Sequence, residues 1–301
     1  MSDVDNLRKA MEGFGTDEDA LIKIVANRSS AQRQKIKDEY KATFGRDLIS
    51  DLKKELGGKL EDAMVAFFLD PVEYDAQSLK NAMKGAGTDE DTLIEIIASR
   101  PPPILKAISS KYESLYNKKL EDDVHKETSG TLRNLLISLL QCKRRVNNNP
   151  NPQECANIAK EIFDAGEAKM GTDESVFNRY FVTLSPNELC CVAQQYHKLS
   201  GHTILEAIDK EFSGASKKAF RTIVYATISP SEYFACRVNE AIKGFGTDDK
   251  LLIRVLITRS EIDMPQIKQY YKQLYGKDMI QAIESDISGH YKKLLVSLCS
   301  H

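Results

Sequence analysis

A short glycine-rich loop recurs four times along this chain, each time with an acidic residue at a fixed distance behind it. Three copies contain Gly-x-Gly-Thr-Asp, at residues 13–17, 85–89 and 244–248, and the remaining copy reads Lys-Met-Gly-Thr-Asp at 169–173. Forty residues after Gly15, Gly87, Gly171 and Gly246 stand Glu55, Glu127, Glu211 and Asp286. We therefore treat a glycine-rich loop and a distant carboxylate as one unit that is built four times.

The composition of the loop points to cation binding. Closely spaced glycines allow positive φ angles, which turn carbonyl oxygens outward instead of into a helix. Outward carbonyls and one carboxylate form an all-oxygen set, and Ca²⁺ accommodates the irregular geometry of such a set better than Mg²⁺ does. The alternative is a plain helix–turn–helix corner, in which the threonine after the second glycine caps the next helix. One copy alone would favour that corner, but fourfold recurrence with the same acidic partner favours a cation site.

Composition excludes several other classes of protein. The EF-hand pattern is absent, and the five histidines show no zinc-ligand pairing with cysteine. No apolar stretch could span a bilayer, the N-terminus does not read as a signal peptide, and the six cysteines indicate reduced thiols in a cytosolic protein. The net charge of −2 argues against nucleic-acid binding and against simple polybasic attraction to membranes. Anionic lipid would therefore have to bind through a bridging cation.

The spacing of the loops predicts the organisation of the chain. The second glycines lie 72, 84 and 75 residues apart, and the wide middle gap holds an Asn/Pro-rich segment. We predict repeats at 1–71, 72–143, 156–229 and 230–301, in two pairs that are joined by a linker at 144–155. In the first repeat the pattern predicts helices at 3–11, 17–27, 31–44, 47–56 and 59–68, with Ser29 or Ser30 capping the third. The predicted fold is all-α, with about five short helices per repeat.

These motifs resemble the annexin family over nearly the whole chain, from Asp5 to about Ser300. The glycine loop with its distant acid carries the resemblance, together with the Ser-Gly that follows the acid at 129–130, 213–214 and 288–289. The resemblance implies a curved disc of four repeats around a central hydrophilic channel, with the loops on the convex face. It also implies reversible, Ca²⁺-dependent binding to anionic phospholipid such as phosphatidylserine, by a cytoplasmic protein that becomes peripheral on membranes when Ca²⁺ rises. Self-association on the membrane stays open.

The resemblance assigns the Ca²⁺ ligands residue by residue. They are the carbonyls of Met11, Gly13 and Gly15 with Glu55; Met83, Gly85 and Gly87 with Glu127; Gly166, Lys169 and Gly171 with Glu211; and Ile242, Gly244 and Gly246 with Asp286. The third repeat departs from the pattern, because Lys169 replaces a glycine and Leu184 stands where the others have Arg28, Arg100 and Arg259. We expect these arginines to hold the loop carbonyls. The third loop is therefore predicted to be the most mobile, with two arrangements close in free energy. In the resting one Glu211 lies too far from the loop carbonyls to share a cation, and in the other Ca²⁺ and lipid draw them together and expose Met170.

Two other classes of function compete with membrane binding. The resemblance places a group of charged residues near the central channel, which would suit ion conduction but also the pairing of repeats: Asp75, Glu95, Arg254, Arg259 and Asp263. An enzyme is not expected, because there is no nucleophile–base–acid set and no phosphate loop. Little chain precedes the first predicted helix, so partners bound through an N-terminal tail are not expected. The apolar loop-tip residues Phe14, Met170 and Phe245 could enter the membrane interface or could simply be isolated exposed side chains.

Overall fold

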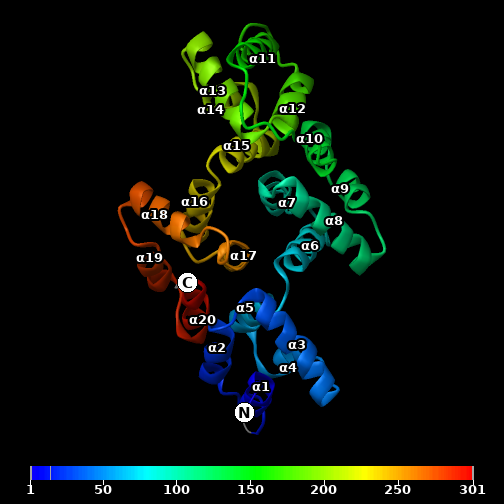
Figure 1. The fold of residues 1–301 in the computed structure, drawn as a ribbon, viewed down its shortest axis with the longest axis vertical. Helices are drawn as coiled ribbons and strands as arrows, with labels where there is room; N and C mark the ends of the chain where they lie inside the picture. The colour runs from blue at the N-terminus through cyan, green and yellow to red at the C-terminus, as the bar shows by residue number, and fades with distance from the viewer. Residues whose placement is uncertain (1, 14, 300–301) are drawn as a thin grey trace. The chain divides into compact units, whose positions relative to one another are not determined.

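The computed structural model describes residues 2–13 and 15–299, and these residues form twenty helices and no strand. The first repeat contains α1 (Asp3–Ala10), α2 (Glu18–Ala26), α3 (Ser30–Phe44), α4 (Leu48–Glu55) and α5 (Gly58–Phe67). The second contains α6 (Pro71–Ala82), α7 (Glu90–Ser99), α8 (Pro102–Tyr116), α9 (Leu120–Glu127) and α10 (Gly130–Leu140). The third contains α11 (Pro152–Ala165), α12 (Glu174–Thr183), α13 (Pro186–Ser200), α14 (Ile204–Glu211) and α15 (Gly214–Ile228). The fourth contains α16 (Pro230–Ile242), α17 (Asp249–Arg259), α18 (Met264–Tyr275), α19 (Met279–Asp286) and α20 (Gly289–Cys299) (Figure 1).

The all-α prediction is confirmed, and each of the five helices predicted for the first repeat ends within one residue of its expected bounds. Ser29 caps α3 through a capping box, in which its side chain accepts from the Gln32 amide and Gln32 returns a bond to the Ser29 amide. The stripe predicted for this helix lies against the core, because Ile36 and Tyr40 are buried. Local capping chemistry and apolar periodicity therefore determine these helix positions.

The chain divides into two compact units, residues 1–74 with 234–301 and residues 75–233. In the first unit α2 and α5 pack against α20, and α17 packs against α5 and α20. In the second unit α7 packs against α15, and α11 packs against α13. An aromatic cluster forms the core of the third repeat, where the rings of Phe177 and Phe212 lie 5.0 Å apart and those of Phe212 and Phe220 lie 4.4 Å apart.

The segment predicted as a linker lies inside the second unit and is bonded to the third repeat. Arg144 donates to the carbonyls of Leu184 and Phe181 at 2.6 and 3.0 Å, and the Arg145 amide donates to the Thr183 carbonyl at 2.7 Å. The Arg144 guanidinium thus satisfies carbonyls at the C-terminal end of α12, and its burial lowers its pKa to about 10. The sequence suggested that the first and second repeats form one pair and the third and fourth the other. The compact units instead combine the first repeat with the fourth and the second with the third.

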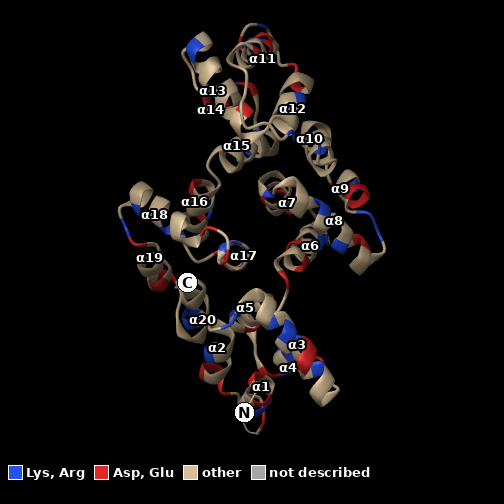
Figure 2. Cartoon of the chain, viewed as in Figure 1, with Lys and Arg blue, Asp and Glu red and all other residues tan. Residues whose placement is uncertain are grey.

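Charge is distributed over both units. Figure 2 shows Lys and Arg interleaved with Asp and Glu on the helices, in keeping with the net charge of −2. Among the described residues, no helix is long and apolar enough to cross a membrane.

Candidate metal-binding loops

Each glycine-rich loop connects the first and second helices of its repeat and is closed by one backbone hydrogen bond. The amides of Asp17, Asp89 and Asp248 donate to the carbonyls of Ala10, Ala82 and Ala241 at 2.8–2.9 Å. The side chains of these three aspartates, and that of Asp173 in the third loop, cap the helices that follow. The sequence-based assignment of threonine as the cap was therefore wrong, because the carboxylate one residue later reaches the free helix amides instead.

The glycines take the backbone conformation that the cation hypothesis requires. Gly85 and Gly87 have φ of 99° and 95°, Gly244 and Gly246 have 125° and 88°, and the first loop has the same pattern. A Cβ at these positions would meet no neighbouring atom within 4 Å, so the backbone angle is what demands glycine.

The predicted ligand carbonyls of the second and fourth loops are free of protein donors. Within the described residues, no hydrogen bond reaches the carbonyl oxygens of Met83, Gly85 and Gly87, or those of Ile242, Gly244 and Gly246. Three unpaired carbonyls in one short loop remain available to water or to a cation.

The threonine of each loop instead holds the acidic residue. Thr16 and Thr88 donate to the carboxylates of Glu55 and Glu127 at 3.1 Å, and Thr172 and Thr247 donate to those of Glu211 and Asp286 at 2.5 Å. Residues that lie 39 positions apart are thus brought together in every repeat, which joins each loop to its predicted carboxylate. Sequence reasoning missed this contact, although the invariant spacing of threonine and acid in the four repeats carried the signal.

This donor set suits Ca²⁺. Among the described residues, no three His, Cys, Asp or Glu side chains come together as a metal-binding group, so backbone carbonyls would supply most of the donors at each loop. Neutral carbonyls with a single carboxylate form a hard oxygen set of low charge, and the several free positions leave room for ligands from another molecule.

The third loop is built differently. It is one residue longer, since the Asp173 amide closes it on Ala165 at 2.7 Å, and its Lys169 amide donates to the Gly166 carbonyl at 3.0 Å. Among the described residues only Asn117 and Cys142 combine a side chain with positive φ, so Lys169 does not reproduce the conformation of the glycine it replaces. One of the three carbonyls predicted to bind Ca²⁺ here therefore already accepts one internal hydrogen bond.

Glu211 lies directly against this loop, contrary to the expectation that it would lie away at rest. A Cβ on Gly166 would come within 3.1 Å of the Glu211 side chain, and Thr172 donates to the same carboxylate. Gly166 is buried, so the absence of a side chain at this position is what admits the acid.

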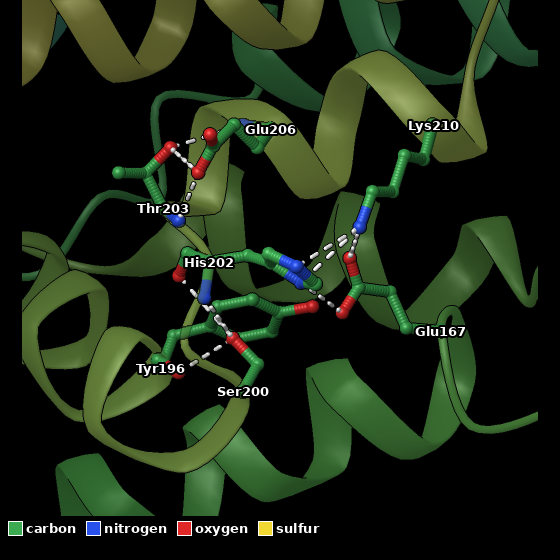
Figure 3. A network of polar contacts seen from close by, with 7 residues as sticks. All are labelled: Glu167, Tyr196, Ser200, His202, Thr203, Glu206 and Lys210. Atoms are coloured by element: carbon green, nitrogen blue, oxygen red, sulfur yellow. Dashed lines mark hydrogen bonds and ion pairs between the residues drawn. The ribbon is translucent and has the colours of Figure 1, made fainter.

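A polar network not foreseen from the sequence fastens the third loop to the rest of its repeat (Figure 3). Glu167 contacts the imidazole of His202 at 3.3 Å and the ammonium of Lys210 at 3.1 Å. Burial of Glu167 opposes ionisation, but these two partners outweigh it and lower the pKa of the carboxyl. The expectation that this loop is the most weakly held of the four therefore has no support in its contacts.

The arginines expected to hold the loop carbonyls pair with carboxylates instead. Arg28 binds Asp3 through two nitrogens at 2.7 and 3.0 Å, Arg100 binds Asp75 at the same distances, and Arg259 binds Asp263 at 2.8 Å. For Arg28 and Arg259, whose printed side-chain bonds within the described residues reach no loop carbonyl, the role proposed from the sequence was wrong, because a bidentate carboxylate is a stronger partner than a neutral carbonyl.

In the third repeat both halves of this ion pair are replaced by apolar groups. Leu184 is fully buried, and Ala159, which stands 25 residues before it as Asp3 stands before Arg28, is fully buried too. Leu184 therefore belongs to the core and is not a loop support that has been lost.

Comparison with known proteins assigns the family. The annexin model matches residues 2–67, 74–139, 158–223 and 233–298, so this chain belongs to the annexin family. It is 43% identical over 296 residues to human annexin A7, covering 98% of this chain and 61% of that protein, so it spans about three fifths of the length of this relative. Among solved structures, annexin III superposes with a TM-score of 0.97 at 38% identity, covering 99% of this chain and 93% of that one. A calcium-bound annexin (Sm)1 superposes with a TM-score of 0.88 at 30% identity, covering 99% and 89%.

The family relationship confirms the predicted fold of four annexin repeats and the prediction that the chain is not an enzyme, since annexins are a non-enzymatic family. Annexins bind Ca²⁺, and membership of this family implies calcium-dependent phospholipid binding. The individual ligands of this chain remain a prediction.

Proposed function

We propose that this chain binds anionic phospholipid membranes reversibly, through Ca²⁺ ions that bridge its loops and the lipid headgroups. The observation that carries the proposal is the second loop, where three carbonyls lack protein donors and Thr88 holds the Glu127 carboxylate beside them. The first and fourth loops repeat this arrangement with Glu55 and Asp286. The calcium-bound annexin (Sm)1 structure, whose fold this chain shares, supports the choice of cation.

The low charge of the donor set determines how Ca²⁺ binding and lipid binding affect each other. One carboxylate leaves each bound Ca²⁺ with a net positive charge and vacant coordination positions, so affinity for Ca²⁺ alone is weak. A lipid phosphate or carboxylate that enters a vacant position strengthens Ca²⁺ binding. Linkage then requires Ca²⁺ to strengthen lipid binding by the same factor. Because the protein itself carries a net charge of −2, little attraction to an anionic surface remains when the cation is removed.

The four loops contribute unequally in this proposal. The third loop is the weakest Ca²⁺ site, because its Gly166 carbonyl already accepts from the Lys169 amide and offers a cation only its remaining lone pair. The predicted carbonyls of the second and fourth loops accept no hydrogen bond from the described residues.

Exposed apolar residues at two loop tips add a second contact with the membrane. Met170 and Phe245 are fully exposed, although they are large hydrophobic side chains. In a complex held by the adjacent Ca²⁺ ions, both side chains enter the interfacial region of the bilayer. Phe14, the corresponding residue of the first loop, lies outside the described residues.

Three of the five charged residues that the sequence offered as a conducting group form buried ion pairs. Asp75 pairs with Arg100 within the second unit, and Arg259 pairs with Asp263 within the first. Each pair satisfies charges that would otherwise be buried alone, so structural pairing accounts for these three residues and we propose no conducting role.

Co-sedimentation with liposomes across a Ca²⁺ titration tests the proposal, with phosphatidylserine vesicles against pure phosphatidylcholine vesicles. We expect pelleting only with phosphatidylserine and only with Ca²⁺, as suits a cytoplasmic protein that attaches peripherally when Ca²⁺ rises. Pelleting that persists in excess EGTA would overturn the bridging mechanism.

A further inference from the structure

A polar cavity of about 720 Å³ lies within the second unit, between the last helix of the second repeat and the second helix of the third. Its walls come from the end of α9, from α10, and from the third loop with the start of α12. The cavity falls within the range of about 300–1,000 Å³ that small-molecule sites occupy. Two of its lining residues adjoin the candidate Ca²⁺ sites: His125 precedes Glu127 by two residues, and Lys169 belongs to the third loop.

Positive and negative side chains both line this cavity. Arg133 and Lys169 supply two cations, and neither forms an ion pair within the described residues. Arg133 uses only its Nε, which donates to the Thr128 carbonyl at 2.6 Å, so both terminal nitrogens of its guanidinium remain free to donate. Asp173 and Glu174 supply two anions, at the end of the same loop that carries Lys169, whereas Arg133 lies on α10.

The two anions have structural partners but keep acceptor capacity. Asp173 caps α12 by accepting from the amide and hydroxyl of Ser175, and Glu174 accepts from the hydroxyl of Thr131 across the cavity. A carboxylate has about four acceptor positions, so each can still accept from a ligand ammonium.

This balance of charge selects the kind of ligand. A simple anion would be attracted by the two cationic side chains but repelled by the two carboxylates. A simple cation would be attracted by the carboxylates but repelled by the cationic side chains. A ligand that carries a phosphate and an ammonium group satisfies both signs of charge, with the phosphate on the Arg133 guanidinium and the ammonium on the carboxylates. Hydroxyl and amide groups, including those of Ser138 and Asn178, line the remaining wall and can bond the rest of a polar headgroup.

We propose that this cavity is a second, Ca²⁺-independent subsite for an ammonium-bearing phosphodiester, the chemistry of an aminophospholipid headgroup. The inference rests on the proposed membrane function for its biological context, since the cavity lies beside two of the candidate Ca²⁺ loops. Its role there is to distinguish lipids of equal charge: a headgroup with an ammonium fits the cavity, and one that carries hydroxyls in its place does not.

The test uses soluble headgroups and the full chain in EGTA, which removes any contribution from Ca²⁺. Glycerophosphoserine should give saturable shifts in the amide NMR signals of residues 131–138 and 169–178. Glycerophosphoglycerol and inorganic phosphate, which lack the ammonium, should bind at least tenfold more weakly. Equal binding of these three probes, or shifts from glycerophosphoserine that fall elsewhere, would overturn the proposal.

Variants locate the subsite. Arg133→Gln should weaken glycerophosphoserine binding about tenfold, the loss expected when a charge-assisted bond to phosphate is removed, and Arg133→Lys should recover most of it. The matched control is Lys292→Gln, since Lys292 holds the same position in α20 that Arg133 holds in α10, is likewise half-buried, and does not line the cavity. Thermal unfolding by circular dichroism confirms that each variant is folded. Binding that survives Arg133→Gln, or that Lys292→Gln reduces equally, would refute the site.

Vesicle binding shows whether the ligand is a membrane lipid headgroup or a free phosphodiester. It also tests this inference independently of the proposed function. At saturating Ca²⁺, Arg133→Gln should lose the preference for phosphatidylserine over phosphatidylglycerol vesicles, and Lys292→Gln should keep it. An unchanged preference, with glycerophosphoserine binding lost, would overturn the lipid source. Failure of every headgroup experiment alongside Ca²⁺-dependent pelleting would refute the cavity subsite and leave Ca²⁺ bridging intact.

Discussion

The hydrogen bond from threonine to the distant acid makes a specific prediction about Ca²⁺ affinity. Replacing Thr88 or Thr247 by valine keeps the β-branched shape and removes only the hydroxyl that holds Glu127 or Asp286 against its loop. We expect both variants to bind Ca²⁺ more weakly, because the carboxylate must then be ordered at the moment of binding.

The size of the effect follows from the geometry of each contact. The bond from Thr88 to Glu127 is 3.1 Å long and the acid is exposed, so its loss should cost about 1 kcal/mol, or about fivefold at that site. The acid that Thr247 holds, Asp286, is half-buried, so the loss of that bond should cost about 2 kcal/mol, or roughly thirtyfold. Thr247→Val should therefore be the more damaging variant.

The assay is the Ca²⁺ concentration at half-maximal binding to phosphatidylserine vesicles, compared with calorimetry of the same variants. The vesicle midpoint should rise by less than the effect at the site, since three loops stay intact. Thr43→Val serves as control, because the Thr43 side chain is exposed and makes no hydrogen bond within the described residues. If the hydroxyl instead blocks a carboxylate lone pair that Ca²⁺ needs, the midpoint falls. A midpoint that falls or stays constant in both variants would refute the reasoning.

Three further predictions follow from the contacts. Glu127→Gln should raise the Ca²⁺ midpoint for vesicle binding, and Glu211→Gln should change it least, because the Gly166 carbonyl beside that acid is internally bonded; a larger effect from Glu211→Gln would contradict this ranking. Leu184→Arg should lower the midpoint of thermal unfolding without raising Ca²⁺ affinity. The variant buries a charge where no carboxylate stands, at a cost of about 3 kcal/mol. A stable variant that binds at lower Ca²⁺ would show instead that an arginine at this position supports the loop. Asp51→Asn should destabilise the fold by about 2 kcal/mol at pH 7, because the Arg46 guanidinium, against the opposing effect of burial, holds the pKa of Asp51 well below its usual range. Since the carboxyl is more acidic when folded, its contribution to stability is present above about pH 4 and disappears as pH falls further. Urea unfolding should therefore show a smaller difference in stability between the variant and the unmodified protein at pH 3 than at pH 7. A constant difference would exclude this ionisation as the cause.

The fold was readable from the sequence because its determinants are local. Apolar periodicity and capping residues such as Ser29 act within one or two turns of helix, so each helix of the first repeat could be placed within one residue. Which loop residue caps the following helix could not be predicted in the same way. Two candidates, Thr16 and Asp17, stand side by side, and only the position of Glu55 decides that threonine faces the acid and aspartate the helix.

The candidate site was predictable as a pairing of loop and acid, but its supports were not. The arginines occupy equivalent places in three repeats, which suggested a role at the loop, yet their partners are carboxylates such as Asp3 and Asp75, which lie 25 residues earlier. The third loop illustrates the same limit. Its Lys169 was visible as a departure, but the internal bond to Gly166 and the anchoring of Glu167 by His202 depend on tertiary contacts that spacing does not reveal.

Calorimetric titration of Ca²⁺ into the protein, with and without phosphatidylserine vesicles, tests the bridging mechanism most directly. Bridging predicts weak binding in the absence of vesicles and a marked gain in Ca²⁺ affinity in their presence, which should grow as the phosphatidylserine fraction rises. Equal Ca²⁺ affinity in the two titrations would contradict the central claim, because it would show that lipid supplies no ligand to the bound cation.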